Sequence, residues 1–302
     1  MKRWLKLVAI GLSGIVALLL LAGAGLYVAG GSRIHRRYDV QPPALSIPIG
    51  DTAAIARGRH LAEAVTGCHG CHGDQLQGGV LIDEPMMATL YASNLTPGRG
   101  GIGPAYTDAD LVRAIRHGVN SQGRGLMIMH ADAYNRLGPE DLGALVAYVR
   151  SVPAVDSALP PMRTGPLGRI LVALGMLDRD AMPLIPAEHI DHRAPLAPTP
   201  PPGVTAAYGE YLVSIAMCRM CHGANLGGGP PLDEGARPAP NIAGYAAPGV
   251  WTEAQFIGTI RNGVTPAGRT LDAEYMPWDV YARMTDEELL AIWRYLESLA
   301  RR

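Results

Sequence analysis

The sequence contains few residues of several types, and these shortages argue against some kinds of partner and of core. Phenylalanine occurs once in 302 residues, and charged residues make up 18% of the chain. The formal net charge is −1 and no basic block is present, so nucleic acid is not expected as a partner. This length allows about two domains of ordinary size. Built from side chains alone, each of them has a modest core, which a buried prosthetic group would enlarge.

Cysteine is also scarce, but its placement is informative. All four cysteines fall in two Cys-x-x-Cys-His runs, Cys68–His72 and Cys218–His222. This spacing is typical of covalent c-type haem attachment, because two thiols must reach the vinyl groups of one porphyrin and the histidine must reach its iron. A zinc site made of four cysteines would leave both histidines unused, and a redox pair would need a βαβ context that neither run has. The predicted attachment residues are Cys68, Cys71, Cys218 and Cys221, with His72 and His222 as proximal ligands.

The two runs belong to an internal repeat, which predicts a duplicated domain. Thr107–Gly118 aligns on Thr252–Gly263 without a gap. Each copy indicates three helices, of which the last carries apolar residues at i, i+3, i+4 and i+7 and is expected to pack on the first. The predicted helices begin near Thr52, Thr107 and Pro139 in the first copy, and near Ala206, Thr252 and Thr285 in the second. Neither copy shows an alternating strand pattern of useful length, so the predicted fold class is all-α.

The chain begins with a candidate membrane anchor. The uncharged run Leu7–Ser32 is longer than the roughly 20 residues that cross a hydrocarbon core of about 30 Å. The alternative is a cleaved signal peptide with Ala22-Gly23-Ala24 as its cleavage site. Basic residues balance on the two sides of the run, so they do not decide the orientation. Because bacteria attach this kind of haem in the periplasm, the haem domains are expected there.

The expected organisation has five segments, and one stretch has two interpretations. The segments are an anchor (1–37), a proline-containing tether (38–50), a first cytochrome domain (51–152), a proline-rich linker (153–203) and a second cytochrome domain (204–302). The linker contains an apolar stretch, 167–177, that is too short to cross a membrane. We expect it to form a short helix in the cleft between the domains. The alternative is a helix lying on the membrane or on a partner subunit.

Each haem also needs a distal ligand from later in its copy. In the second copy Met276 is the best candidate, and the repeat aligns Met129 with it. In the first copy Met127 and His130 compete with Met129. The repeat favours Met129, because Met129 and Met276 each stand five residues before a matching tyrosine. Met129 and Met276 are therefore the predicted distal ligands. Two other histidines, at positions 60 and 117, are not kept in the second copy and are expected to be ordinary helix residues.

On these residues the chain resembles the membrane-anchored dihaem class I cytochromes c of bacteria. It is similar to the cytochrome c subunits that serve periplasmic alcohol and sugar-acid dehydrogenases. The resemblance rests on the two haem runs and on Asn94-Leu95-Thr96-Pro97, Gly101-Ile102-Gly103 and Ile115–Gly118. It implies helical domains with one haem c each, His/Met ligation and one-electron transfer. Those subunits often carry three haems where this chain has two, and their usual Met-Pro is kept at Met276-Pro277 but reads Met129-His130 in the first copy.

The leading functional hypothesis is a membrane-anchored electron carrier without chemistry of its own. Expected partners are the membrane and a redox protein, namely a periplasmic dehydrogenase, a bc-type complex or a terminal oxidase, and no small-molecule substrate is expected. The expected location is the bacterial inner membrane, with the haem domains in the periplasm. Two alternatives stay open: a dihaem enzyme of peroxidase type with one open haem face, and a structural or redox-sensing subunit of a larger complex.

Overall fold

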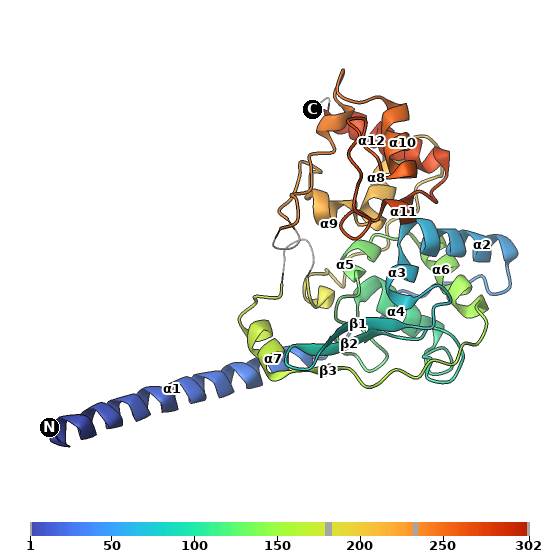
Figure 1. The fold of residues 1–302 in the computed structure, drawn as a ribbon. Coiled ribbons are helices and arrows are strands. Elements are labelled where there is room, and N and C mark those ends of the chain that lie inside the picture. The colour runs from blue at the N-terminus through green and yellow to red at the C-terminus, as the bar shows by residue number, and fades with distance from the viewer. Residues whose placement is uncertain (1, 179–182, 232–234, 301–302) are drawn as a thin grey trace.

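The computed structural model describes residues 2–178, 183–231 and 235–300. Two helical domains lie one on the other, and helix α1 (Lys2–Ile34) projects from the first of them (Figure 1). The most apolar 18-residue window of α1 has a mean hydropathy of 2.5, and none of it is buried against the protein. The predicted apolar helix is therefore present, and most of its length has no protein neighbour in the described chain.

The two domains repeat the same order of helices. The first contains α2 (Thr52–His60), a π-helical turn η1 (Leu61–Val65), α3 (Cys68–His72), α4 (Asp108–His117), α5 (Ala131–Tyr134) and α6 (Pro139–Ser151). The second contains α8 (Ala206–Ile215), α9 (Cys218–His222), η3 (Gly244–Ala246), α10 (Glu253–Asn262), α11 (Trp278–Tyr281) and α12 (Asp286–Ala300).

Helices α4 and α10 begin and end as the sequence predicts. Thr107 and Thr252 each form a reciprocal capping box with the residue three positions on. Gly118 and Gly263 end the helices with φ of 63° and 65°, a left-handed conformation that glycine adopts without strain. The three expected helices of each copy are thus confirmed, except that the first helix of domain one changes to a π-turn after His60.

The last helix of each domain packs on the first, as the apolar stripes predict. A glycine allows each pair to approach closely. A Cβ on Gly58 would lie 2.0 Å from the carbonyl oxygen of Ala144, and one on Gly209 would lie 1.9 Å from that of Ala291. The same contact therefore occurs twice, at matching positions of the repeat.

This close packing predicts that Gly209→Ala destabilises domain two. The added methyl group must push α8 away from α12, and overpacking of this kind typically costs about 1–3 kcal/mol. Gly258→Ala is the matched control, because a Cβ there meets no atom within 4 Å and alanine favours a helix interior by up to about 1 kcal/mol. Thermal unfolding of the haem-loaded chain checks both variants. Equal stability of the two would contradict the packing described here.

The all-α prediction is wrong in domain one, which contains a small antiparallel sheet. Strand β1 (Gly79–Glu84) pairs with β2 (Ala88–Ala92), which pairs in turn with β3 (Arg163–Thr164). Alternate residues along β2 are buried, but two of the three buried residues are alanines. Alanine is uncommon in strands, so the sequence shows only a weak strand pattern here. The third strand comes from the linker, more than 70 residues later, so its pairing is a long-range contact that a local pattern does not reveal.

The apolar stretch of the linker forms helix α7 (Pro166–Ala173), but not where we expected it. It packs against the end of α1, not in a cleft between the domains. Glycines explain the contact: a Cβ on Gly30 would lie 1.9 Å from the carbonyl oxygen of Arg169, so the two backbones nearly touch. In the sequence Gly30 and Gly31 look like part of an uninterrupted membrane span, and nothing local marks them as a docking point.

The tether and the linker pack on domain one. Val40 of the tether forms a small buried cluster with Val119, Ile185 and Ala187, the last two from the linker. His117, expected to be an ordinary helix residue, does lie at the end of α4, but it is buried and its Nδ1 lies 3.2 Å from Nδ1 of the linker residue His192. Burial lowers the pKa of His117 to about 4. Domain one therefore holds both segments that flank it.

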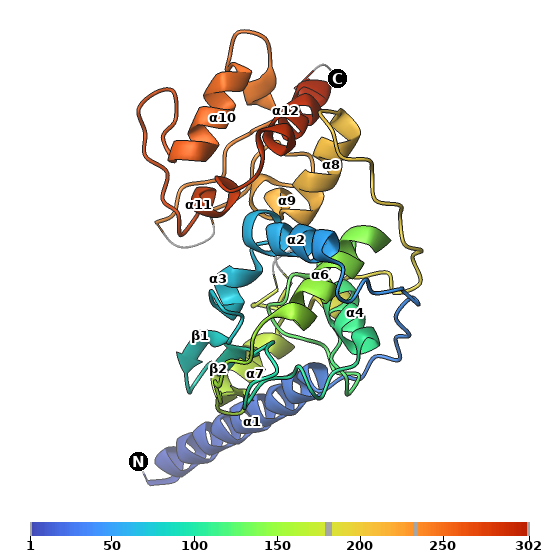
Figure 2. The ribbon, with the colours of Figure 1, turned by 90° about the vertical axis from the view of Figure 1, so that its right-hand side faces the viewer.

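The two domains lie one on the other (Figure 2), and matching elements of the repeat meet across their interface. Helix α5 of domain one contacts α8 of domain two, and α11 of domain two contacts η1 of domain one. These are equivalent elements of the repeat, with the roles of the two domains exchanged. The duplicated domains are therefore related by a local two-fold axis that passes through the interface.

A buried polar network crosses this interface and obeys the same symmetry. Arg57 donates to Asp141 at 2.9 Å within its own domain and to Glu288, the repeat equivalent of Asp141, at 3.1 Å. Tyr211 donates to Asp141 at 2.8 Å, and its repeat equivalent His60 lies 2.7 Å from Glu288. The expectation that His60 is an ordinary helix residue is thus wrong, because its partner comes from the other domain.

Candidate functional site

The two Cys-x-x-Cys-His runs form short helices, α3 and α9, with the same backbone conformation. Each run is preceded by a left-handed residue, Gly67 at φ 63° and Met217 at φ 60°. Each is followed by a glycine at φ 78° or 80°. The helical turn brings the two cysteines of a run to one side, and the residues with positive φ at both ends turn the chain sharply before and after the run.

Both predicted proximal histidines are oriented by a backbone carbonyl. The Nδ1 atom of His72 donates to the carbonyl oxygen of Ser93 at 2.8 Å, and that of His222 donates to Pro240 at 2.9 Å. Because a carbonyl only accepts, the proton must be on Nδ1 and the lone pair on Nε2 is free for a metal. Burial lowers the pKa of both imidazoles, and the carbonyl bonds oppose this only in part. Each ring is therefore neutral and held in a fixed orientation, with its Nε2 lone pair free.

The cysteine thiols do not have the character of a redox-active pair. Burial raises the pKa of Cys68 and Cys71, and it raises the pKa of the Cys218 thiol to about 12. Redox-active Cys-x-x-Cys pairs have a thiol with a lowered pKa in an electropositive, accessible place. The surroundings here are apolar instead, as expected where the sulfurs contact a porphyrin edge.

In domain one the predicted ligands line a common apolar cavity. Cys68, Cys71 and His72 line it, and so do all three distal candidates, Met129, Met127 and His130. The rest of the wall is formed mainly by apolar side chains of the helices, the sheet and the loops, including Leu76, Leu81, Tyr91, Leu95, Ile102, Leu111 and Leu145. Folding therefore brings the haem run and the later loop together, as the sequence predicts.

The backbone of the two methionine loops closes in the same register. The amide of Ala131 donates to the carbonyl of Met129 at 2.7 Å, and the amide of Trp278 donates to that of Met276 at 2.6 Å. The intervening residues, His130 and Pro277, have φ of −72° and −73°. His130 thus occupies a proline-like backbone position, and the two methionines are structural equivalents.

The matching tyrosines close the loops in the same way. The hydroxyl of Tyr134 donates to the carbonyl of Thr66 at 2.6 Å, and that of Tyr281 donates to Ala216 at 2.7 Å. Both acceptors lie two residues before the first cysteine of their run. Each tyrosine therefore ties the start of a haem run to the helix that follows a methionine.

Two residues that the sequence patterns do not predict also line the cavity of domain one. Met217 belongs to domain two, directly before Cys218, and Tyr134 donates to its Sδ at 3.7 Å. Met162 comes from the linker. A signal for Met217 exists in the repeat, which places it opposite Gly67, so a long side chain stands in a left-handed position where the other copy has glycine. The first site is therefore completed by the second domain.

The Asn94–Pro97 turn has a structural role. Asn94 Nδ2 donates to the carbonyl of Val155 at 2.8 Å, and Asn94 Oδ1 accepts from the Thr96 amide. Both side chains are buried. The turn fastens the start of the linker, and its residue Leu95 lines the cavity.

The residues present fit a covalently bound haem c in each domain. Each domain supplies two thiols and one imidazole with a free Nε2, which is the donor set that this group needs, and domain one adds an apolar wall around them. In domain two, Nε1 of Trp278 is buried and lacks a hydrogen-bond partner among the described residues, as happens where the acceptor belongs to a bound group. The fold and the site thus define two c-type cytochrome domains in one chain.

Comparison with known proteins agrees with this class. Residues 53–149 match the family model described as cytochrome c oxidase, cbb3-type, subunit III, and residues 206–300 match that of cytochrome c. The chain is a protein with two cytochrome c domains and two covalent haem c groups, and it is homologous to the cytochrome c subunits of fructose, alcohol (quinone) and gluconate dehydrogenases.

Three relatives illustrate this homology. The fructose dehydrogenase cytochrome subunit of Gluconobacter japonicus is 31% identical, with 82% of this chain and 52% of the relative covered. The alcohol dehydrogenase (quinone) cytochrome c subunit of Gluconacetobacter polyoxogenes is 27% identical, with 83% and 57% covered. The gluconate 2-dehydrogenase cytochrome c subunit of Pantoea cypripedii is 30% identical, with 82% and 60% covered. The chain spans a little more than half the length of these relatives.

Proposed function

We propose that this protein relays single electrons from a dehydrogenase partner to a membrane-linked acceptor, with its haem domains on the periplasmic side. The observation that carries the proposal is the duplicated site, in which a neutral histidine and an equivalent methionine accompany each pair of haem-binding cysteines. The homology to dehydrogenase cytochrome subunits supports a dehydrogenase as the donor. The apolar helix α1 supports attachment to the membrane.

In this proposal the side chains hold and shield the redox group and do not react. His72 and His222 would bind the irons through Nε2, and Met129 and Met276 would each supply the second protein ligand. The bound haem supplies one-electron chemistry, and histidine–methionine ligation raises its potential relative to two histidines. If each iron has two protein ligands in this way, no substrate is expected to bind to it. The apolar wall excludes water, so less solvent has to reorganise when the iron changes its charge.

The interface suggests how the two sites cooperate. Met217, directly before Cys218, lines the cavity of domain one. The chain that attaches the second haem thus directly borders the site of the first. The polar network around Arg57 then keeps the two domains at one distance, which a relay needs because electron transfer falls steeply with separation.

This function predicts a specific haem content and spectrum. The denatured polypeptide is expected to carry the mass of two haems, and Cys218→Ala to disturb the second attachment while the first remains. The native protein is expected to be low-spin in both redox states and not to bind carbon monoxide. Mass spectrometry and absorption spectroscopy check these points. A high-spin fraction near half of the haem, with carbon monoxide binding, would contradict the relay and favour a peroxidase-type enzyme.

The partner is tested on membranes solubilised in mild detergent. The haem-stained band is expected to co-purify with a dehydrogenase subunit, and addition of that enzyme's substrate is expected to reduce both haems. Variants at His222 serve as controls, because they retain domain one and lose the second site. Reduction by substrate that is unaffected by these variants would show that the second haem takes no part in the relay.

A further inference from the structure

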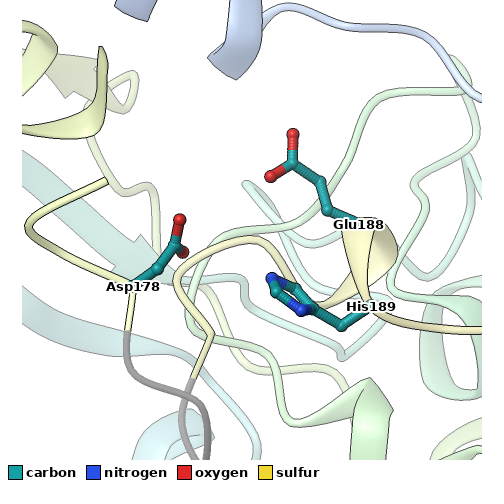
Figure 3. Close-up of side chains that lie close together, drawn as sticks. All are labelled: Asp178, Glu188 and His189. Carbon is teal, nitrogen blue, oxygen red and sulfur yellow. The ribbon is translucent and has the colours of Figure 1, made fainter. Parts of the chain in front are cut away.

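The end of helix α1 is clamped to domain one. The Arg33 guanidinium forms ion pairs with Asp178 and Glu188, with Nε donating to Glu188 at 2.8 Å, and it donates to the carbonyl of Val172 at 2.9 Å. Asp178, Glu188 and His189 lie close together (Figure 3), but both carboxylates are already paired with Arg33, so the group acts as a clamp and not as a cation site. With the Gly30 contact to α7, the clamp fixes the direction of α1 relative to the domain.

The length of α1 then determines how far α7 lies from the centre of a bilayer. The helix has 33 residues and rises about 1.5 Å per residue, whereas the hydrocarbon core takes roughly 20 residues. If the core begins after Lys6, it ends near Leu26, and the last turns of α1 lie at the level of the headgroups. Two aromatic residues agree with this placement, because Trp4 and Tyr27 stand near the two expected boundaries, where such side chains gather.

Four exposed apolar side chains lie beside these last turns. They are Met86 (61% exposed) in the β1–β2 turn and Leu167 (43%), Leu174 (52%) and Met176 (66%) on and after α7. The turn and the helix are joined, since the amide of Leu167 donates to the carbonyl of Met86 at 3.0 Å. Figures 1 and 2 show both elements at the end of the body from which α1 projects. We call these four residues the membrane-contact face.

We infer that the membrane-contact face inserts into the headgroup region of the bilayer beside α1. The inference rests on the proposed membrane anchor, because continuity with α1 is what selects lipid as the occupant. A protein partner would have to bind in the layer that the lipid headgroups already fill. Nearby, the Arg169 guanidinium lies 4.7 Å from the centre of the Tyr27 ring, an arrangement suited to an interface with an apolar and a wet side.

Membrane contact here would place the site of domain one close to the bilayer. The strands that carry the β1–β2 turn also line the cavity, through Leu81 and Tyr91, and Met162 lines it next to β3. The sheet therefore connects the membrane-contact face directly to the wall of the first haem site. In this arrangement the site of domain one lies beside the membrane-contact face.

The test measures the depth of single nitroxide labels on the full haem-loaded chain in lipid nanodiscs. All native cysteines are consumed by haem, so Leu18→Cys, Met176→Cys and Val250→Cys each offer one reactive thiol. We expect the label at 18 to be relaxed by oxygen and shielded from a water-soluble nickel complex. At 176 the oxygen-to-nickel ratio should be several-fold higher than at 250, an exposed position on domain two.

The other possible results of this experiment contradict the inference in different ways. Equal ratios at 176 and 250, with 18 buried in lipid, would overturn the membrane-contact face while the anchor stands. A water-accessible label at 18 would overturn the anchor itself and the inference with it. Shielding of 176 from both reagents would mean that protein, not lipid, covers this face, which also contradicts the inference.

Discussion

Replacing Met129 by alanine is expected to remove about half of the sulfur-to-iron charge-transfer absorption of the ferric protein. The reason is that one of two equivalent thioether ligands is lost while Met276 remains. The potential of one haem should fall by roughly 0.2 V, a fraction of the range of about 0.8 V that axial ligation covers. Near-infrared absorption and a redox titration followed at the haem band measure the two effects.

His130→Ala and Met127→Ala are the matched controls, because both side chains line the same cavity. Each is expected to leave the absorption band and both potentials nearly unchanged. The expectation follows from the shared turn, in which His130 takes the backbone position of Pro277 and Met129 that of Met276. A loss of half the band in Met127→Ala would identify that residue as the ligand. If His130→Ala changes one potential while Met129→Ala changes neither, the first haem has two histidine ligands.

Arg57→Ala is expected to weaken the folded chain by about 3–5 kcal/mol, the usual effect of removing one partner from a buried ion pair. The substitution leaves the carboxylates of Asp141 and Glu288 buried without their shared cation. It also removes a direct link between the domains, so the haem domains should unfold at separate temperatures. Chemical and thermal unfolding of the haem-loaded protein measure the loss.

Arg99→Ala is the control for this prediction. Arg99 pairs with Asp156 at the surface, where both side chains are mostly exposed. Surface ion pairs contribute about 0–1 kcal/mol, so this variant should unfold almost as the unchanged protein does. A similar stability of the two variants would show that the Arg57 network does not hold the domains together.

The same network predicts a loss of stability in acid. Burial alone would raise the pKa of Glu288, but the hydrogen bonds from His60 and Thr285 and the charge of Arg57 hold it below its usual value. A carboxyl group with a lowered pKa in the folded state stabilises the protein above its unfolded pKa of about 4.3, and the contribution disappears as the pH falls through the folded value. Glu288→Gln should flatten this part of the stability profile.

Much of the site follows from the sequence alone, because its chemistry depends on local spacing. The thiols and the imidazole of a haem run must lie on one helical turn, so Cys68–His72 and Cys218–His222 identify two attachment sites without reference to the rest of the chain. The duplication adds long-range information, since Met129 can be aligned with Met276. The capped helices of both copies are likewise determined by nearby residues, as Thr107 and Gly118 illustrate.

Other features were decided only by the tertiary structure, and they share one physical cause. The sheet needs β3 from the linker, Met217 reaches a site in the other domain, His60 finds Glu288, and Gly30 meets the backbone of α7. In each case the two partners are separated by more than 70 residues, and neither shows locally what the other supplies. Such contacts depend on how whole surfaces fit together after the local elements have formed, so periodicity and spacing do not reveal the partner. For Met217 the repeat marks only an unusual residue in a left-handed position.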